Sequence, residues 1–124
     1  LAARATIMGW SNWFVAKSAA YHMGSASSGK NPGFSVYYIY RNNFPMLFKN
    51  FPLSILVRMM PGLIMTDIKT IFELVRGRNK IALKALIRGR IHGLRLLPIM
   101  SKKRRAMRAA RQIHTKDLWN LMKS

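Results

Sequence analysis

The sequence predicts a mainly α-helical chain that opens with the end of an α/β domain carrying one or two short strands. Helices are predicted because apolar side chains recur every three or four positions from residue 52 onward. One strand, or two short ones, is predicted over residues 13–21, which start with aromatic and β-branched side chains. We therefore divide the chain into residues 1–50, the end of the α/β domain, and residues 51–124, a helical appendix.

The first half is predicted to alternate between regular elements and turns. Residues 1–8 favour a helix that stops at Gly9, because glycine readily adopts the left-handed conformation found at helix ends. The Gly- and Ser-rich residues 23–33 indicate a loop. A helix over residues 35–50 carries aromatic side chains on one face, and Pro45 is expected to kink it.

The second half is predicted to contain basic amphipathic helices. The first covers residues 52–76 and is expected to bend or break at Pro61-Gly62. The second covers residues 80–97, with apolar side chains on one side and Lys and Arg on the other. A third helix is expected after Ser101, whose hydroxyl would cap it, and a short helix closes the chain.

The charge of the chain excludes several kinds of site. There are 22 Lys and Arg residues against three acids, which gives a net charge of +19. The acids Asp67, Glu73 and Asp117 are far apart in sequence, so the chain alone offers neither a paired-carboxylate site nor an Asp-rich magnesium cage. The absence of cysteine excludes disulfides and thiolate zinc sites, and it is compatible with a reducing cytosolic setting.

High charge is combined here with high apolar content. Half of the residues are apolar, and residues 76–111 hold 13 Lys or Arg and no acid. Apolar helix faces bordered by cations are typical of peripheral binding to an anionic membrane surface. The most apolar stretch, residues 51–65, is interrupted by Arg58 and Pro61-Gly62, and it is shorter than the roughly 20 residues of a membrane span.

Four groups of residues follow one another along the chain. The first is the end of a predicted helix: Leu1, Arg4, Gly9 and Trp10. The second is a predicted strand that leads into a histidine and a Ser-rich loop: residues 14–21, His22, Ser25, Ser27 and Ser28. The third is an aromatic helix with Arg-Asn: Tyr37, Tyr38, Arg41 and Asn42. The fourth is the Arg-Gly-x-x-x-Gly-Leu sequence of residues 88–94.

In this order the four groups resemble the C-terminal part of family 2 glycosyltransferases, in particular the rhamnosyltransferase-like branch. In that family an acidic pair precedes the helix of the first group. The strand departs from the family pattern at Ala16 and Ser18, where proline and alanine are usual.

The resemblance implies that residues 1–50 end a GT-A-type, Rossmann-like catalytic domain. The activity it implies is inverting transfer of a sugar from a nucleotide-sugar donor to a cell-surface glycan or a lipid-linked acceptor. Together with the basic amphipathic helices, it leads us to expect a peripheral protein on the cytoplasmic face of the membrane. The catalytic base and an Asp-x-Asp element would precede Leu1. The chain is accordingly expected to be a fragment, without transferase activity by itself.

The resemblance also implies roles for seven residues. His22 would complete a Mn²⁺ or Mg²⁺ site with the upstream Asp-x-Asp element, since a neutral imidazole is a ligand for such metals. The loop after it would close over the pyrophosphate through hydroxyl and ammonium donors, which belong to Ser25, Ser27, Ser28 and Lys30. Arg41 and Asn42 would shape the wall of the donor site.

Simpler interpretations stay open for the same residues. His22 could satisfy a hydrogen bond at a strand end, and Arg41 and Asn42 could join their helix to the domain. His92 and His114 are expected at the surface of basic helices. For the whole chain, the pI near 11.7 also suits a basic nucleic-acid-binding helical module. We disfavour nucleic acid as the partner, because the basic block is interleaved with Leu and Ile rather than with aromatic residues or glycine.

Overall fold

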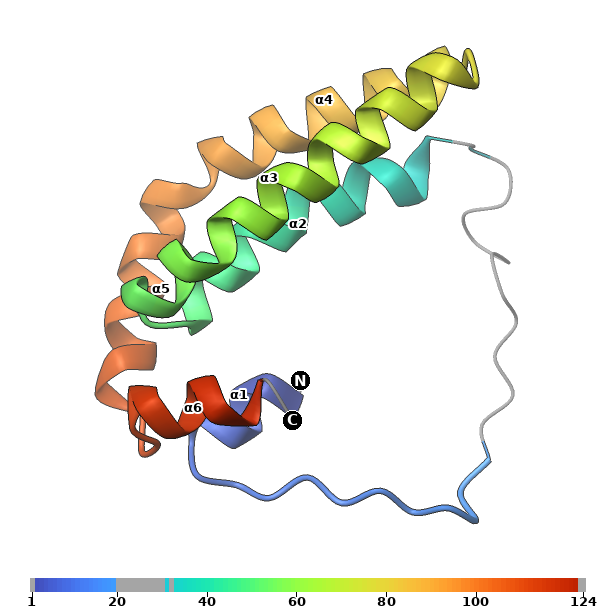
Figure 1. Ribbon diagram of the computed structural model, residues 1–124. Helices are drawn as coiled ribbons and strands as arrows, with labels where there is room; N and C mark the ends of the chain where they lie inside the picture. Colours follow the sequence, from blue (N-terminus) through green and yellow to red (C-terminus); the bar gives the residue numbers. More distant parts are fainter. Residues whose placement is uncertain (1, 20–30, 32, 123–124) are drawn as a thin grey trace.

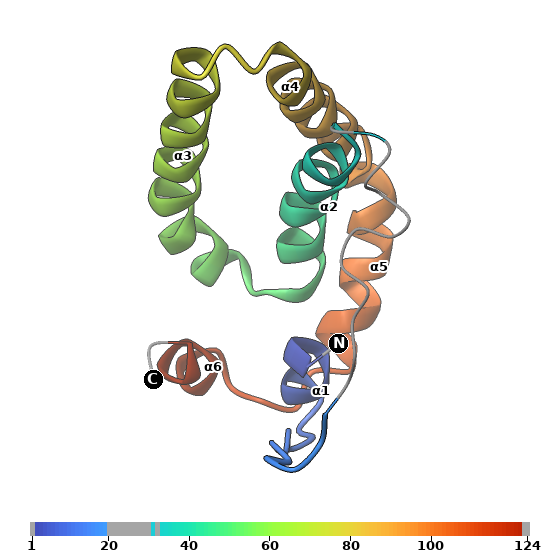
Figure 2. The ribbon, with the colours of Figure 1, turned by 90° about the vertical axis from the view of Figure 1, so that its right-hand side faces the viewer.

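Six helices make up the computed structural model, which describes residues 2–19, 31 and 33–122 (Figure 1). In chain order they are α1 (Ala2–Ile7), α2 (Phe34–Asn50), α3 (Leu53–Arg76), α4 (Lys80–Arg95), α5 (Leu97–Ala109) and α6 (Thr115–Leu121). Helices α2 and α4 pack side by side, and α3 stands apart from them in Figure 2. Helix α5 continues from α4 toward α1 and α6, where both ends of the chain lie (Figures 1 and 2). The prediction of a mainly α-helical chain is confirmed.

The predicted strand is wrong for the part of it that the structure describes. Residues 13–19 form no strand, and a turn closes where the Ser18 amide donates to the Val15 carbonyl at 3.0 Å. A strand needs a neighbour that exchanges backbone hydrogen bonds, and no described segment of the chain is a strand. Trp13 and Phe14 are 86% and 91% exposed, so no packing supplies the burial that a half-buried strand gains.

The helix boundaries follow the sequence closely, with two differences. α2 and α3 each continue through their prolines, Pro45 and Pro61, so of the bend or break expected at Pro61-Gly62 the break is wrong. The third predicted helix begins before Ser101, at Leu97, with proline in its first turn. The Ser101 hydroxyl therefore does not cap the helix; it donates to the Leu97 carbonyl one turn back. The stop at Gly9 is confirmed, because its φ is +80° just after α1.

The main core lies where α1, α5 and α6 meet the end of α2 and the start of α3. Its buried side chains are Ile7, Leu47, Phe51, Ile55, Leu56, Met107 and Leu118. A hydrogen bond from the Gln112 amide to the Ile7 carbonyl, 3.0 Å long, ties α1 to the segment after α5. The opposite end of α2 is supported by α4, through buried Ala82 and Leu86.

Two glycines let α4 lie against the backbone of α2. A Cβ added at Gly89 would be 2.6 Å from the Tyr37 carbonyl oxygen, and one added at Gly93 would be 2.7 Å from that of Arg41. Both distances are shorter than any non-bonded contact a side chain tolerates, so only glycine fits at either position. The Gly-x-x-x-Gly spacing of residues 89–93 places both glycines on one face of α4. This packing sets the distance between α4 and the aromatic residues of α2.

Candidate functional site

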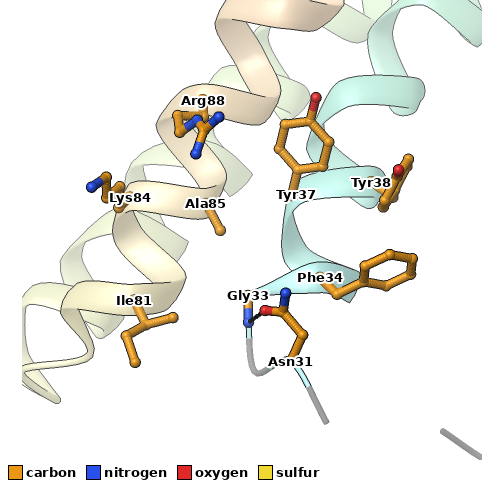
Figure 3. A pocket seen from close by; sticks show the side chains of 9 residues that line it. All are labelled: Asn31, Gly33, Phe34, Tyr37, Tyr38, Ile81, Lys84, Ala85 and Arg88. Atoms are coloured by element: carbon orange, nitrogen blue, oxygen red, sulfur yellow. Dashed lines mark hydrogen bonds between the residues drawn. The ribbon is translucent and has the colours of Figure 1, made fainter. Parts of the chain in front are cut away.

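A cleft opens where the start of α2 meets the first half of α4 (Figure 3). Its volume is about 400 Å³. Side chains from both helices line it: Asn31, Gly33, Phe34, Tyr37, Tyr38, Ile81, Lys84, Ala85 and Arg88. No acidic residue is among them, so the cleft combines aromatic surface with uncompensated positive charge.

The floor of the cleft is formed by a tight approach at the first residues of α2. The Asn31 side-chain oxygen accepts a hydrogen bond from the Gly33 amide at 3.2 Å, which holds the turn that starts the helix (Figure 3). Gly33 is buried, and a Cβ there would be 3.2 Å from the Ala85 methyl group on α4. The Phe34 amide, the first of α2, donates to the Asn31 carbonyl at 3.0 Å, so the turn before the helix already uses the first two amides at its start.

Three aromatic rings line the α2 side of the cleft. Phe34 and Tyr38 have ring centroids 4.6 Å apart, and Tyr37 meets Tyr38 edge-on at 5.0 Å. The Tyr37 hydroxyl is hydrogen-bonded to His92 Nδ1 on α4 at 2.7 Å. This bond fixes the Tyr37 ring at the cleft wall, because the phenol is held at both its backbone and its hydroxyl end.

The α4 side of the cleft carries its two cations. Lys84 and Arg88 are four residues apart on α4, so they lie on the same side of that helix. In Figure 3 the Arg88 guanidinium lies over the ribbon of α4, whereas the Lys84 ammonium extends away from α2. Of the two cations on α4, Arg88 is therefore the one we assign to a ligand that also contacts the aromatic residues. A guanidinium suits phosphate or carboxylate groups, and the ring faces suit a flat base or a sugar.

The predicted donor-site residues are distributed unevenly around this cleft. Arg41 lies one turn further along α2, half-buried, with its guanidinium 5.7 Å from the centre of the Tyr38 ring. It touches the cleft only through that ring, and the neighbouring Asn42 is exposed and does not line it. The other five predicted site residues lie outside the described residues: His22, Ser25, Ser27, Ser28 and Lys30.

The described residues do not test the predicted metal site, because His22 lies outside them. No group of three His, Asp or Glu side chains is found among the described residues. One of the three acids, Asp67, is held by Arg90 in a two-pronged ion pair, with N–O distances of 2.6 and 2.7 Å. The Arg90 guanidinium also lies 4.8 Å from the centre of the Tyr40 ring. Metal binding by His22 stays a prediction.

Sequence reasoning missed three residues at this site. Lys84 and Arg88 were assigned to a polar helix face, and His92 was expected at the surface, whereas it is half-buried and bonded to Tyr37. The usable signal was the Gly-x-x-x-Gly spacing of residues 89–93, because it predicts a close helix contact on that face of α4. A close contact of α4 at these glycines brings Arg88 and His92, which lie beside them, toward α2.

The chemistry of the lining residues is what characterises the cleft. It offers aromatic faces and two cations within one concave surface. Comparison of the chain with protein-family models, with curated proteins and with solved structures finds no match.

Proposed function

We propose that the chain takes part in sugar transfer from a nucleotide-sugar donor to a glycan or lipid-linked acceptor, and that the cleft binds the donor. The observation that carries the proposal is the position and lining of the cleft. It begins at Asn31, immediately after the loop whose residues resemble a pyrophosphate-closing segment. Its tyrosines and Arg88 supply the two kinds of contact that a nucleoside diphosphate needs.

The chemistry assigned to the cleft is stabilisation of the leaving group. In an inverting transfer the acceptor hydroxyl forms a bond to the anomeric carbon, the bond from that carbon to the diphosphate breaks, and the hydroxyl proton goes to a base. Negative charge then grows on the departing diphosphate. Cations at the cleft, Arg88 and Lys84, would lower the energy of that charge by electrostatic attraction.

Other parts of the proposed reaction belong to residues outside the described structure. His22 is proposed as a ligand of Mn²⁺ or Mg²⁺, which when bound would offset charge on the diphosphate. The base and the carboxylate ligands are proposed to come from outside this chain. Without them, the chain is expected to bind a donor and to transfer no sugar.

We further propose that the protein acts at an anionic membrane surface, as a peripheral protein on the cytoplasmic face. Among the described residues, no helix combines the length and the apolar content that a membrane span requires. The support comes from α3, in which only Ile55 and Leu56 of 24 residues are buried. Exposed apolar side chains recur at helical spacing along one side of it: Leu53, Val57, Ile64, Ile68, Ile71 and Val75. We call these six residues the α3 stripe.

Cations accompany the α3 stripe. Arg58, Lys69 and Arg76 are separated by 11 and 7 positions, close to whole numbers of helical turns, so they share one side of α3. An apolar strip beside a row of cations fits an anionic leaflet, where the strip enters the acyl region and the cations remain among the headgroups. The net charge of +19 disfavours a second copy of the chain on this surface, because two such faces repel.

The test of the proposed function is sugar transfer by the whole protein that contains this sequence. Product formation from a panel of nucleotide sugars, with membrane-extracted acceptors and Mn²⁺, should fall sharply in the His22→Ala variant. His114→Ala is the matched control, since His114 is an exposed histidine remote from the cleft. Transfer that is absent with every donor would contradict the proposed function, and unchanged Mn²⁺-dependent transfer in His22→Ala would remove His22 from the site.

A further inference from the structure

A second cleft, at the opposite end of α2, concentrates positive charge. It lies between the end of α2, the start of α3 and the second half of α5, and its volume is about 380 Å³. Figure 2 shows these three elements converging. The lining residues are Lys49, Asn50, Phe51, Pro52, Leu53, Ser54, Arg104, Met107, Arg108, Arg111 and Thr115. Four of them are cations and none is an acid.

Burial and neighbouring positive charges disfavour the charged forms of two cations in this second cleft, Lys49 and Arg104. Burial lowers the pKa of Lys49, and the nearby charges of Arg4 and Lys103 lower it further. Burial also lowers the pKa of Arg104, with a further contribution from Arg108. Like charges gathered without a counter-charge repel, so an anion in this cleft would be favoured electrostatically.

Two of the four cations are fixed in place by the fold. Arg104 donates to the Phe48 carbonyl and lies 4.9 Å above the centre of the Phe48 ring. Arg111 donates to the Thr115 hydroxyl at 3.0 Å. Lys49 and Arg108, by contrast, make no hydrogen bond or ion pair with any described residue, so their donors are available to a ligand.

A buried polar atom in the same lining also lacks a partner. Asn50 is 7% exposed, and its side-chain oxygen accepts no hydrogen bond from any described residue. A side-chain oxygen that is buried without a donor is costly. A hydrated or protonated oxyanion in the cleft would supply the missing donor, directly or through water.

We propose that the second cleft, formed by Lys49, Asn50, Arg104, Arg108 and Arg111, binds a phosphate group. A phosphate carries up to two negative charges on oxygens that guanidinium groups bind in pairs, which matches the excess of positive charge and of N–H donors here. The binding site is separate from the cleft at the start of α2, because the two share no lining residue.

The phosphate can come from a soluble ion or from a lipid headgroup. Leu53, the first residue of the α3 stripe, lines the second cleft and is 60% exposed. A phospholipid whose phosphate sits in the cleft would therefore have its acyl chains beside the stripe. Both sources present the same phosphate group to the cleft, and the two arms of the experiment below distinguish them.

The first arm titrates the protein with inorganic phosphate in calorimetry, at an ionic strength held constant with chloride. Arg108→Ala is the test variant, because Arg108 is exposed and makes no internal bond whose loss would unfold the protein. Arg105→Ala is the matched control, an exposed arginine on the same helix that does not line the cleft. We expect Arg108→Ala to weaken binding at least about tenfold and Arg105→Ala to change it by less than about twofold.

The second arm measures flotation with phosphatidylcholine vesicles that contain either phosphatidic acid or phosphatidylserine at equal surface charge. Phosphatidic acid exposes a phosphate monoester, so a preference for it that Arg108→Ala abolishes supports the lipid as the source. Binding of inorganic phosphate without a vesicle preference supports the soluble ion. The proposal is overturned if neither phosphate form binds, or if Arg105→Ala and Arg108→Ala lose equal affinity, since charge alone would then explain the binding.

Discussion

The Tyr37 hydroxyl and His92 Nδ1 meet at 2.7 Å and join α2 to α4 beside the candidate donor cleft. Their rings also meet edge-on, with centroids 5.7 Å apart. The two residues are 55 positions apart in sequence, so the bond links the aromatic helix to the basic helix that supplies Arg88. The geometry of the cleft depends on this link and on the two glycines beside it.

Removing the Tyr37 hydroxyl tests the link. Tyr37→Phe leaves a half-buried imidazole nitrogen without its partner, so the free energy of unfolding should fall by about 1–2 kcal/mol. Urea unfolding followed by circular dichroism gives the value. Tyr38→Phe is the control, because the Tyr38 hydroxyl has no hydrogen bond in the described structure, and its unfolding free energy should be unchanged. Equal effects of the two substitutions would show that the bond to His92 contributes nothing.

Alanine at the packing glycines should destabilise the protein. In an exposed helix, alanine in place of glycine stabilises by about 1 kcal/mol. Gly89→Ala, however, would bring a methyl group to 2.6 Å from the Tyr37 carbonyl oxygen, and α4 would have to move away. We expect a net loss of about 1–3 kcal/mol in urea unfolding.

Gly62→Ala on α3 is the control for that experiment, because nothing lies within 4 Å of a Cβ added there. It should gain stability, by up to about 1 kcal/mol. If Gly89→Ala were stabilising to the same extent, the close contact between α4 and α2 would be refuted.

The stability of the protein should rise toward alkaline pH through Lys49. The pKa of Lys49 is lowered in the folded state, chiefly by burial, relative to an unfolded value of 10.5. The unfolded chain therefore binds more protons between these two pKa values, and stability increases with pH across that window. Lys49→Met should raise the melting temperature at neutral pH in phosphate-free buffer and reduce the alkaline rise. The exposed Lys69→Met is the control; a matching effect there would exclude burial of Lys49 as the cause.

Membrane binding should depend on the α3 stripe. Ile68→Asn replaces an apolar side chain that is 56% exposed, and it should weaken flotation with phosphatidylglycerol-containing vesicles about tenfold. Ile39→Asn is matched in residue type and exposure, 58%, but lies on α2, so its binding should stay close to that of the original protein. Equal losses of binding in the two variants, or unchanged binding of Ile68→Asn, would show that the α3 stripe does not contact the membrane.

The helices could be predicted from the sequence because each depends on local spacing. α3 and α4 are assigned within a few residues by the recurrence of apolar side chains, and α1 by the glycine that ends it. The strand over residues 13–21 was predicted from side-chain type alone. Strand formation needs a partner, and the sequence around Trp13 carries no information on whether a partner is present.

The candidate cleft could be predicted only in part. The sequence predicted the aromatic face of α2 and a binding role for the loop before it. It did not predict the roles of Lys84, Arg88 and His92. Their roles depend on which face of α4 turns toward α2, and Gly89 and Gly93 determine that through contacts far apart in sequence. The charge cluster around Lys49 was hidden for the same reason, since α2 and α5 meet only in the folded chain.

Donor binding at the first cleft is tested most directly by calorimetric titration of the protein with nucleotide sugars in the presence of Mn²⁺. The variants to compare are Arg88→Ala, within the cleft, and Arg95→Ala, an exposed arginine on the same helix outside it. We predict that at least one nucleotide sugar binds, that Arg88→Ala weakens it at least about tenfold, and that Arg95→Ala changes it by less than about twofold. Absence of binding by every nucleotide sugar, or equal loss in the two variants, would contradict the account.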